Sequence, residues 1–109
     1  MKIIRAVIRE ERVPYVQKAL LAVQIPGMTC SPVRGRGSQQ GIHLQFRGGV
    51  LTIDLIPKVL VEIIIRDDQE TLVIEQILAA ARTGKEGDGR IFVLPVAEAH
   101  RVRTGDVEV

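Results

Sequence analysis

The chain has 109 residues, of which 26% are charged and 46% hydrophobic, and its formal net charge is +2. This composition predicts one globular domain and excludes an intrinsically disordered chain, while the near balance of charges argues little for a nucleic-acid partner. The sequence has no signal peptide pattern, no apolar run of 18 residues and a single cysteine, Cys30. We therefore expect a cytoplasmic protein without membrane insertion, in which Cys30 is an inert, partly buried thiol.

The first half of the chain predicts the order strand, helix, strand. Residues 2–9 are apolar at most positions, which is typical of a strand buried on most of its surface. Residues 10–24 carry aliphatic side chains at helical spacing, with Pro14 in the first turn, and a proline-glycine pair then ends the pattern. Residues 28–34 form the second candidate strand.

A polar, glycine-rich segment over residues 35–57 separates the two halves. Its glycines Gly35, Gly37 and Gly41 have the spacing G-x-G-x-x-x-G, which is one residue off the dinucleotide-binding fingerprint, and no helical pattern follows them. We therefore reject a Rossmann fold. A loop of about twenty residues is unusual in so small a domain, and such loops are generally functional or disordered.

The second half begins with the strongest strand pattern in the chain, residues 59–65. Glu62 stands in the middle of this apolar run, so its carboxylate either faces solvent at a sheet edge or accepts a hydrogen bond from a ligand. Residues 69–81 carry an apolar stripe at helical spacing. Asp67 is the expected N-cap of this helix, and Glu70 completes a variant of the capping box.

Residues 82–90 join that helix to the last main strand, residues 90–96. Three glycines in this segment permit positive φ angles and leave backbone N–H groups uncovered, which suits a nest for an anion. The segment is either a phosphate loop or an ordinary polar turn, and it is not a Walker A motif. Residues 82–90 also carry three cationic side chains: Arg82, Lys85 and Arg90. After the last main strand, an extended tail would place Arg101 and Arg103 on one face.

The order β-α-β, long loop, β-α-β predicts an α+β fold, the ferredoxin-like double βαβ sandwich, with two helices on one face of an antiparallel sheet. The other face would carry many aliphatic residues and no helix, which predicts oligomerisation. We expect one domain over residues 1–109, with a long effector or partner loop at about 36–57 and a phosphate loop at 82–90.

Three stretches carry the most specific pattern, namely ARTGKEGDGRIFV at 81–93, RVRTG at 101–105 and DLIPK at 54–58. With them, the chain resembles the PII family of nitrogen-regulatory signal proteins over essentially its whole length. The resemblance implies a homotrimer of ferredoxin-like protomers, with no catalytic residues, that binds ATP or ADP in the clefts between subunits.

The resemblance also implies roles for single residues in a nucleotide site. Thr29 and Glu62 would lie near the adenine, and Arg101 would pair with phosphate oxygens through its planar guanidinium fork. Backbone N–H groups of the phosphate loop would donate to the same phosphates. The full set of expected nucleotide-binding residues is Gly27, Met28, Thr29, Gly37, Ser38, Glu62, Ile64, Gly87, Asp88, Gly89, Arg90, Arg101 and Arg103.

A second ligand, 2-oxoglutarate, is implied at the base of the long loop through Mg²⁺ bound to ATP. Gln39 matches the metal-ligating position of the family, and Lys58 matches the residue that pairs with a 2-oxoglutarate carboxylate. The residues expected to bind 2-oxoglutarate are Gly37, Gln39, Gln40, Gly41 and Lys58.

The long loop departs from the family pattern at positions of covalent control. Leu51 stands where uridylylated members carry a tyrosine, and Gly49 matches the serine phosphorylated in some relatives. Ser38 and Gln40 replace residues that are usually basic. These departures predict signalling by ligand binding alone, with the apolar loop tip around Leu51 docking a partner. The alternative is that the tip folds down against its own trimer.

We therefore expect a regulator that senses ATP, ADP and 2-oxoglutarate and controls a nitrogen- or carbon-metabolism enzyme or a membrane transporter. The alternative is a generic ferredoxin-like sensing trimer with another ligand, such as AMP, and another partner. An acylphosphatase-like enzyme would need an asparagine, which the chain lacks, and isolated His43 and His100 argue against a metal-binding trimer. Only two phenylalanines are available for stacking, which argues against an RNA-recognition domain.

Overall fold

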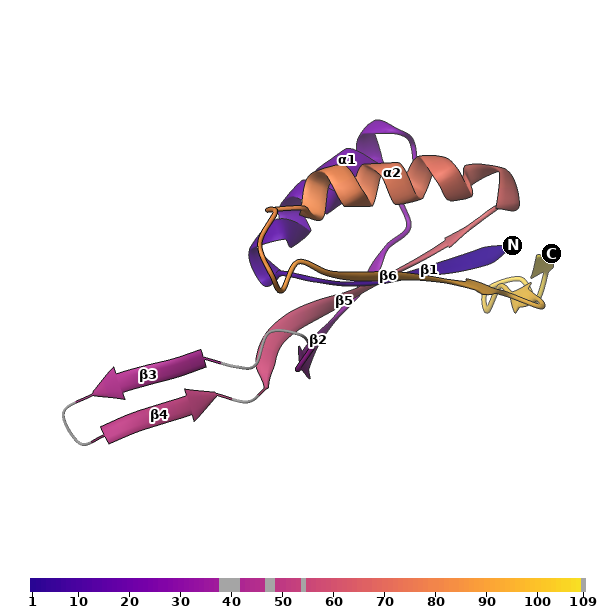
Figure 1. The fold of residues 1–109 in the computed structure, drawn as a ribbon. Coiled ribbons are helices and arrows are strands. Elements are labelled where there is room, and N and C mark those ends of the chain that lie inside the picture. The colour runs from indigo at the N-terminus through magenta and orange to yellow at the C-terminus, as the bar shows by residue number, and fades with distance from the viewer. Residues whose placement is uncertain (38–41, 47–48, 54, 109) are drawn as a thin grey trace.

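The computed structural model describes residues 1–37, 42–46, 49–53 and 55–108. Helices and strands alternate along the chain in the expected order, with two additional short hairpins (Figure 1). The elements are β1 (Lys2–Ile8), η1 (Glu10–Arg12), α1 (Val13–Ala22), β2 (Thr29–Gly35), β3 (Ile42–Phe46), β4 (Gly49–Ile53), β5 (Ile56–Ile65), η2 (Asp67–Gln69), α2 (Glu70–Ala81), β6 (Gly89–Pro95), β7 (Ala99–His100) and β8 (Val107–Glu108).

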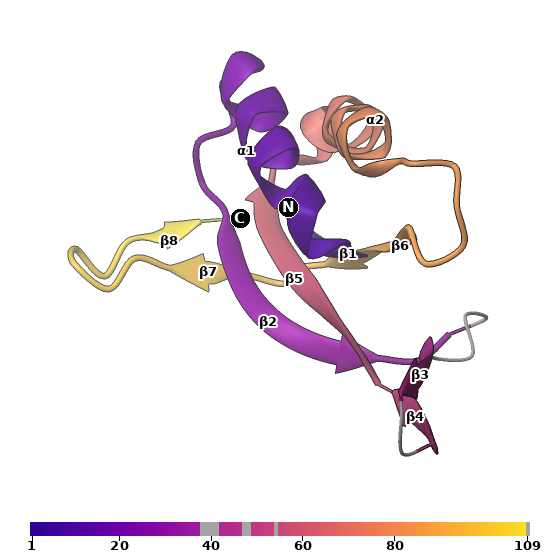
Figure 2. The same cartoon turned by 90° about the vertical axis from the view of Figure 1, so that its left-hand side faces the viewer.

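Four strands form an antiparallel sheet in the order β2-β5-β1-β6. Helices α1 and α2 pack side by side over one face of this sheet (Figures 1 and 2). The strand order and the single helical layer are those of the ferredoxin-like double βαβ fold. The predicted α+β fold class is therefore confirmed.

The core lies between the two helices and the inner strands β1 and β5. Ile4 and Ala6 of β1 are buried, and their register partners on β5 are Ile63 and Val61, which are also buried. Period-2 alternation along each strand directs these side chains toward the helices. The helices contribute the residues at helical spacing: Val16, Leu20, Val73, Ile77 and Ala81.

No helix in the described part of the chain covers the opposite sheet face, which remains largely apolar. Ile64, Phe92 and Leu94 expose 50%, 48% and 40% of their surfaces, and Arg5 lies opposite both Glu62 and Phe92 in the register.

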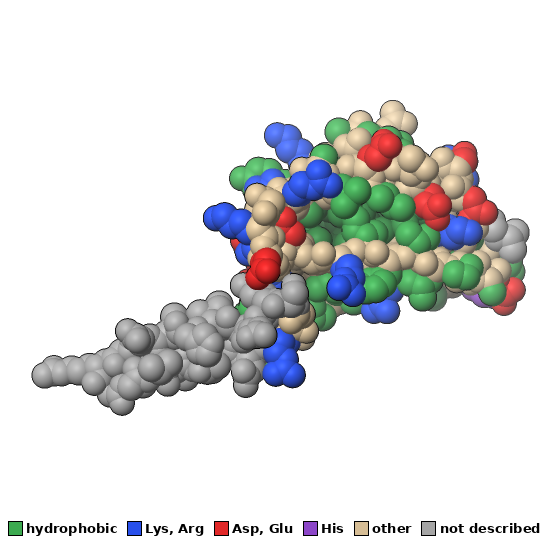
Figure 3. Space-filling model, in the orientation of Figure 1, with side chains coloured by type: hydrophobic (Ala, Val, Ile, Leu, Met, Phe, Trp, Pro, Cys, Tyr) green, Lys and Arg blue, Asp and Glu red, His purple; other side chains and the backbone are tan. Residues whose placement is uncertain are grey.

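A second apolar surface lies on the helix side of the sheet. Figure 3 shows hydrophobic side chains gathered between α2 and β6, where a groove of about 430 Å³ opens. A subunit contact would remove such surface from water.

The long segment between the halves contains a hairpin that the sequence reading missed. Strands β3 and β4 pair from Ile42 with Ile53 to Phe46 with Gly49. Strand β5 then begins at Ile56, three residues earlier than predicted. Pro57 lies beyond the end of the β1 pairing, where β5 pairs only with β2, so no ladder bond to β1 is required of it.

The predicted cap of the second helix is wrong. The segment starts with the 3₁₀ turn η2, so Asp67 is its first residue rather than the residue before it. The backbone N–H of Arg66 donates to Gln69 Oε1 at 3.0 Å, while the Asp67 carboxylate lies 2.9 Å from the N-terminal ammonium group. Attraction between opposite charges accounts for this alternative partner. Glu70 is therefore not the third residue of a capping box.

Candidate functional site

The segment 82–90 adopts the backbone expected of its glycines. The φ angles of Gly84, Gly87 and Gly89 are +87°, +92° and +105°, which is the region that glycine enters without strain. A Cβ atom at position 89 would overlap the carbonyl oxygen of Val7, whereas one at position 84 would meet open space. Gly89 is therefore required by its close approach to β1 as well as by its conformation.

The Asp88 carboxylate organises this segment from within. It accepts hydrogen bonds from the backbone N–H groups of Thr83 and Gly84, each at 2.8 Å, and from the Thr83 hydroxyl. Arg9 Nε donates to the same carboxylate at 3.0 Å. The Thr83 hydroxyl above all, and then Arg9, hold the pKa of Asp88 well below its usual range.

Two cations from the rest of the domain hold backbone carbonyls of the segment. Arg9 Nη2 donates to the Glu86 carbonyl oxygen at 2.6 Å, and Lys58 Nζ donates to that of Gly87 at 2.5 Å. Lys58 is buried, and burial, followed by repulsion from the nearby Arg9 charge, lowers the pKa of its ammonium group. The segment is thus tied to the sheet and to the turn after β1 before any ligand binds.

A hollow of about 470 Å³ opens beside the segment, and we call it the Lys58 hollow. It combines the ends of β2 and β5 with the phosphate loop, and its charged side chains are four cations and the Asp88 carboxylate. Six residues predicted to bind ligand line it: Gly37, Lys58, Gly87, Asp88, Gly89 and Arg90. The remaining lining residues are Val7, Gly35, Arg36, Ile56, Lys85 and Phe92.

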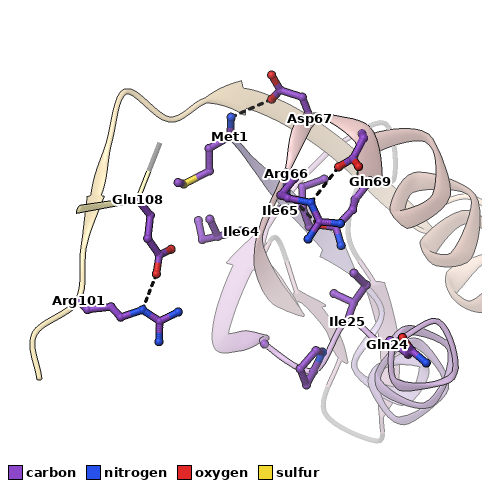
Figure 4. Close-up of a pocket in the computed structure, with 13 residues that line it drawn as sticks. Met1, Gln24, Ile25, Ile64, Ile65, Arg66, Asp67, Gln69, Arg101 and Glu108 are labelled. Carbon is purple, nitrogen blue, oxygen red and sulfur yellow. Dashed lines mark hydrogen bonds and ion pairs between the residues drawn. The ribbon is translucent and has the colours of Figure 1, made fainter. Parts of the chain in front are cut away.

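A second hollow, of about 750 Å³, lies at the other end of the sheet near the chain termini (Figure 4). We call it the Arg101 hollow. It brings together Gly27, Ile64 and Arg101, which are also predicted nucleotide residues. Arg101 Nε lies 2.7 Å from Glu108 Oε1, and both side chains point into the hollow from the β7–β8 hairpin. The other lining residues are Met1, Gln24, Ile25, Pro26, Ile65, Arg66, Asp67, Asp68 and Gln69.

The tail is a hairpin rather than an extended strand, so the expectation that Arg101 and Arg103 share one face of a strand is wrong. The backbone N–H of Arg101 donates to the Asp106 carbonyl oxygen at 2.8 Å, and the backbone N–H of Gly105 donates to the Arg101 carbonyl oxygen at 2.7 Å. Gly105 has a φ of +77°, which allows the chain to reverse. Arg103 lies in this turn, exposed, and lines neither hollow.

Glu62 lies on an inner strand, so the sheet-edge alternative for it is wrong. It is the register partner of Thr29 on β2 and of Arg5 on β1, and all three share the open face. Arg5 Nε approaches Glu62 Oε2 at 3.4 Å, with 30% of the glutamate side chain exposed. The sequence reading missed this pair. Met28, by contrast, packs against the core. Cys30 is exposed, so the prediction that it is partly buried is wrong.

Eight of the predicted nucleotide residues line the two hollows of one protomer, five in the Lys58 hollow and three in the Arg101 hollow. Four others line neither hollow: Met28, Thr29, Glu62 and Arg103. Lys58 and Ile64, one in each hollow, are six residues apart on β5, or roughly 20 Å at about 3.3 Å per residue. Ser38, Gln39, Gln40 and Gly41 lie outside the described residues, so their roles remain predictions.

Within the described residues, no group of three or more His, Cys, Asp and Glu side chains could hold a metal ion. The described helices are also too short or too polar to cross a membrane.

Comparison with known proteins gives a consistent result. The sequence model of the family described as "Nitrogen regulatory protein P-II" matches residues 1–106. The nitrogen regulatory protein P-II of Microchaete diplosiphon is 44% identical over 106 residues, covering 97% of this chain and 95% of that protein. The nitrogen regulatory protein P-II 2 of Methanothermobacter thermautotrophicus is 46% identical over 106 residues, covering 97% of this chain and 92% of that protein.

The fold is also similar to a solved structure, that of Arabidopsis thaliana PII bound to citrate. The TM-score is 0.80 and the sequence identity 38%, and the match covers 98% of this chain and 84% of that chain.

Proposed function

The chain belongs to the nitrogen regulatory protein P-II family, and we propose that it is a homotrimeric sensor of ATP and ADP that regulates a target protein through residues 36–57. The observation that carries this proposal is that eight of the predicted nucleotide residues line two hollows at opposite ends of one sheet. Each hollow supplies half of the groups that a nucleoside polyphosphate requires.

The Lys58 hollow has the chemistry of the phosphate half. Lys58, Lys85 and Arg90 bring positive charge to it, and the glycine-rich backbone would offer N–H groups to a ligand. Such a concave arrangement of donors and cations favours a multiply charged anion. Its carboxylate, Asp88, is already engaged by four donors, so it does not offer a free negative charge.

The Arg101 hollow and the open sheet face would supply the other half from a neighbouring protomer. Residues in the two hollows of one protomer are too far apart to contact the same phosphates, since about 20 Å of strand β5 separates Lys58 from Ile64. In a closed ring of three copies, one end of a protomer faces the opposite end of the next. The apolar open face would be covered in the same assembly.

A dicarboxylate fits the base of the Lys58 hollow as the second ligand, and we take 2-oxoglutarate as the effector. Its carboxylate would replace the Gly87 carbonyl as the partner of the Lys58 ammonium group, which would then have an anionic acceptor in place of a neutral one. Mg²⁺, which prefers oxygen ligands, would be held by phosphate oxygens and the Gln39 amide and would neutralise phosphate charge. The citrate in the Arabidopsis PII structure is a related polycarboxylate.

The regulatory output would come from the hairpin β3–β4, which extends away from the sheet in Figure 1. Gly37 precedes this segment and Ile56 follows it, and both line the Lys58 hollow. A ligand there can shift the segment only by the free energy with which it favours one arrangement over another. ATP with Mg²⁺ and 2-oxoglutarate would favour one arrangement, while ADP cannot complete the same metal site.

Calorimetry with ATP, ADP and AMP, with and without Mg²⁺ and 2-oxoglutarate, tests this function. We expect ATP and ADP to bind, 2-oxoglutarate to bind only with ATP and Mg²⁺, and light scattering to give the mass of three chains of 12.0 kDa. Tighter binding of AMP than of ATP would instead support the generic sensing trimer. A pull-down from the source cell with ATP or ADP present would identify the target.

A further inference from the structure

Arg9 lies at the junction between β1 and η1, far in sequence from the phosphate loop that it contacts. Its side chain is only 19% exposed, and its guanidinium reaches two points of the loop at once. Nε donates to the Asp88 carboxylate at 3.0 Å and Nη2 donates to the Glu86 carbonyl oxygen at 2.6 Å. The planar guanidinium presents its donors in fixed directions, so two such bonds restrict the loop more than one flexible contact would.

Asp88 presents a problem for a phosphate site, because a carboxylate next to bound phosphates repels them. The structure resolves it by enclosing the carboxylate, which is 24% exposed, with three donors from the loop itself and with the positive charge of Arg9. Gly87 and Gly89, on either side of Asp88, both have positive φ angles. Removing Arg9 would leave the carboxylate charge uncompensated beside the hollow.

We propose that Arg9 and Asp88 are positioning residues of the phosphate loop, an inference that rests on the proposed nucleotide-binding function. Neither side chain needs to touch the nucleotide. Asp88 arranges the loop backbone as a nest for a nucleoside polyphosphate, and Arg9 neutralises Asp88 and fixes the nest against the first turn of the domain. Contacts of an ordinary polar turn would not require this charge compensation.

The test is a double-mutant cycle on ATP affinity. We expect Arg9→Ala to weaken ATP binding about tenfold or more, since a charge-assisted bond and a compensating charge are both lost. Asp88→Asn should weaken it less, because the amide keeps one acceptor and removes the negative charge. The double variant Arg9→Ala/Asp88→Asn should bind ATP more tightly than Arg9→Ala alone, which is the signature of relieved repulsion.

Arg12→Ala is the matched control, because Arg12 Nε donates to the Ala80 carbonyl oxygen at the end of α2 instead of to the phosphate loop. This variant should keep its ATP affinity within about twofold. Adenosine, which has no phosphate, should bind Arg9→Ala as it binds the wild type. Arg9→Lys keeps the positive charge but loses the planar guanidinium, so its ATP affinity should lie between those of the wild type and Arg9→Ala. It replaces Arg9→Ala in the test if that variant does not fold.

The outcomes separate this inference from the function on which it rests. A wild-type protein that does not bind ATP would overturn both. ATP binding that is equal in the wild type, Arg9→Ala and Arg9→Lys would overturn the inference alone. A double variant that binds ATP no better than Arg9→Ala would also overturn it, because the contacts would then be merely structural.

Discussion

The two ends of the sheet differ in how far they are organised in a single protomer. At the Lys58 hollow, Asp88 accepts four hydrogen bonds and the cations Arg9 and Lys58 hold the loop carbonyls. At the Arg101 hollow, the Arg101–Glu108 pair is 63% and 41% exposed and stands on a short terminal hairpin. One end is preorganised, while the other presents its cations to solvent.

This difference bears on how binding energy would be distributed. An exposed ion pair such as Arg101–Glu108 contributes about 0–1 kcal/mol, so a phosphate can displace Glu108 at little cost. The loop network could not be exchanged so easily, because each enclosed donor would lose its acceptor. We therefore expect the hydrogen bonds of Asp88 and Arg9 to persist on binding, with only the Lys58–Gly87 bond exchanged for a ligand carboxylate, and we expect the Arg101 end to rearrange.

The largest effect should come from closing the space at Gly89. Gly89→Ala places a side chain at φ +105° against the Val7 carbonyl, and we expect the free energy of unfolding to fall by about 3 kcal/mol or more. Gly84→Ala, at φ +87° with open space around it, should lose only about 1–2 kcal/mol. Urea unfolding followed by circular dichroism measures both. Equal losses would show that the loop is less rigidly held than we describe.

The Arg101 end should be important for affinity rather than for stability. We expect Arg101→Ala/Arg103→Ala to weaken ATP binding at least about tenfold, because hydrogen bonds to charged groups contribute about 1.5–3 kcal/mol each. Glu108→Ala is the control, since it releases Arg101 from its partner and should leave affinity unchanged or higher. Unchanged affinity in the double arginine variant, measured by calorimetry, would remove these residues from the site.

Between the two ends, Glu62 should determine the choice of base. Glu62→Gln should reduce the preference for ATP over GTP by roughly fivefold, because an amide can donate to the guanine keto oxygen and one hydrogen bond contributes about 1 kcal/mol. Glu98→Gln, at a carboxylate that pairs with His100, is the control. Competition binding measures the ratio of the ATP and GTP affinities. A ratio equal to that of the wild type would show that Glu62 does not select the base and only pairs with Arg5.

The preorganised end should also show in the acid stability of the fold. The pKa of Asp88 is lowered from its ordinary value of 3.8 by the Thr83 hydroxyl and Arg9, so its stabilisation is complete above pH 3.8 and is lost as the pH falls toward the folded-state pKa. Asp88→Asn cannot lose this contribution. The stability difference between wild type and variant should therefore shrink below pH 3.8, and a constant difference would contradict the loop network.

The smallest effect on nucleotide binding is expected at the tip of the long segment. Leu51→Asp should leave ATP affinity unchanged and abolish capture of a nucleotide-dependent partner, because a carboxylate cannot enter an apolar partner pocket. Parallel calorimetry and pull-down check both properties. Surviving partner capture, or a fall in ATP affinity, would show that the tip is not a separate docking element.

Periodicity predicted the sheet and helices well because apolar spacing reflects which face is buried. The sequence does not predict the hairpin β3–β4, although Ile42, Leu44 and Phe46 alternate with polar residues, because the glycines around it indicate a continuous loop. The Arg9–Asp88 bond joins residues 79 apart in sequence, and no local pattern reveals such a contact. An extended tail does not form, because Gly105 reverses the chain into a hairpin.

Mixing of subunits tests the central claim, that each nucleotide site combines the Lys58 hollow of one protomer with the Arg101 end of its neighbour. Protomers carrying Lys58→Ala/Arg90→Ala would be co-expressed with protomers carrying Arg101→Ala/Arg103→Ala, and ATP sites would be counted by calorimetry. Each variant alone should bind weakly, whereas random mixed trimers should regain about a quarter of the wild-type sites, because one junction in four unites two intact halves. Mixed trimers without any recovered sites would contradict a shared site and place the nucleotide within one chain.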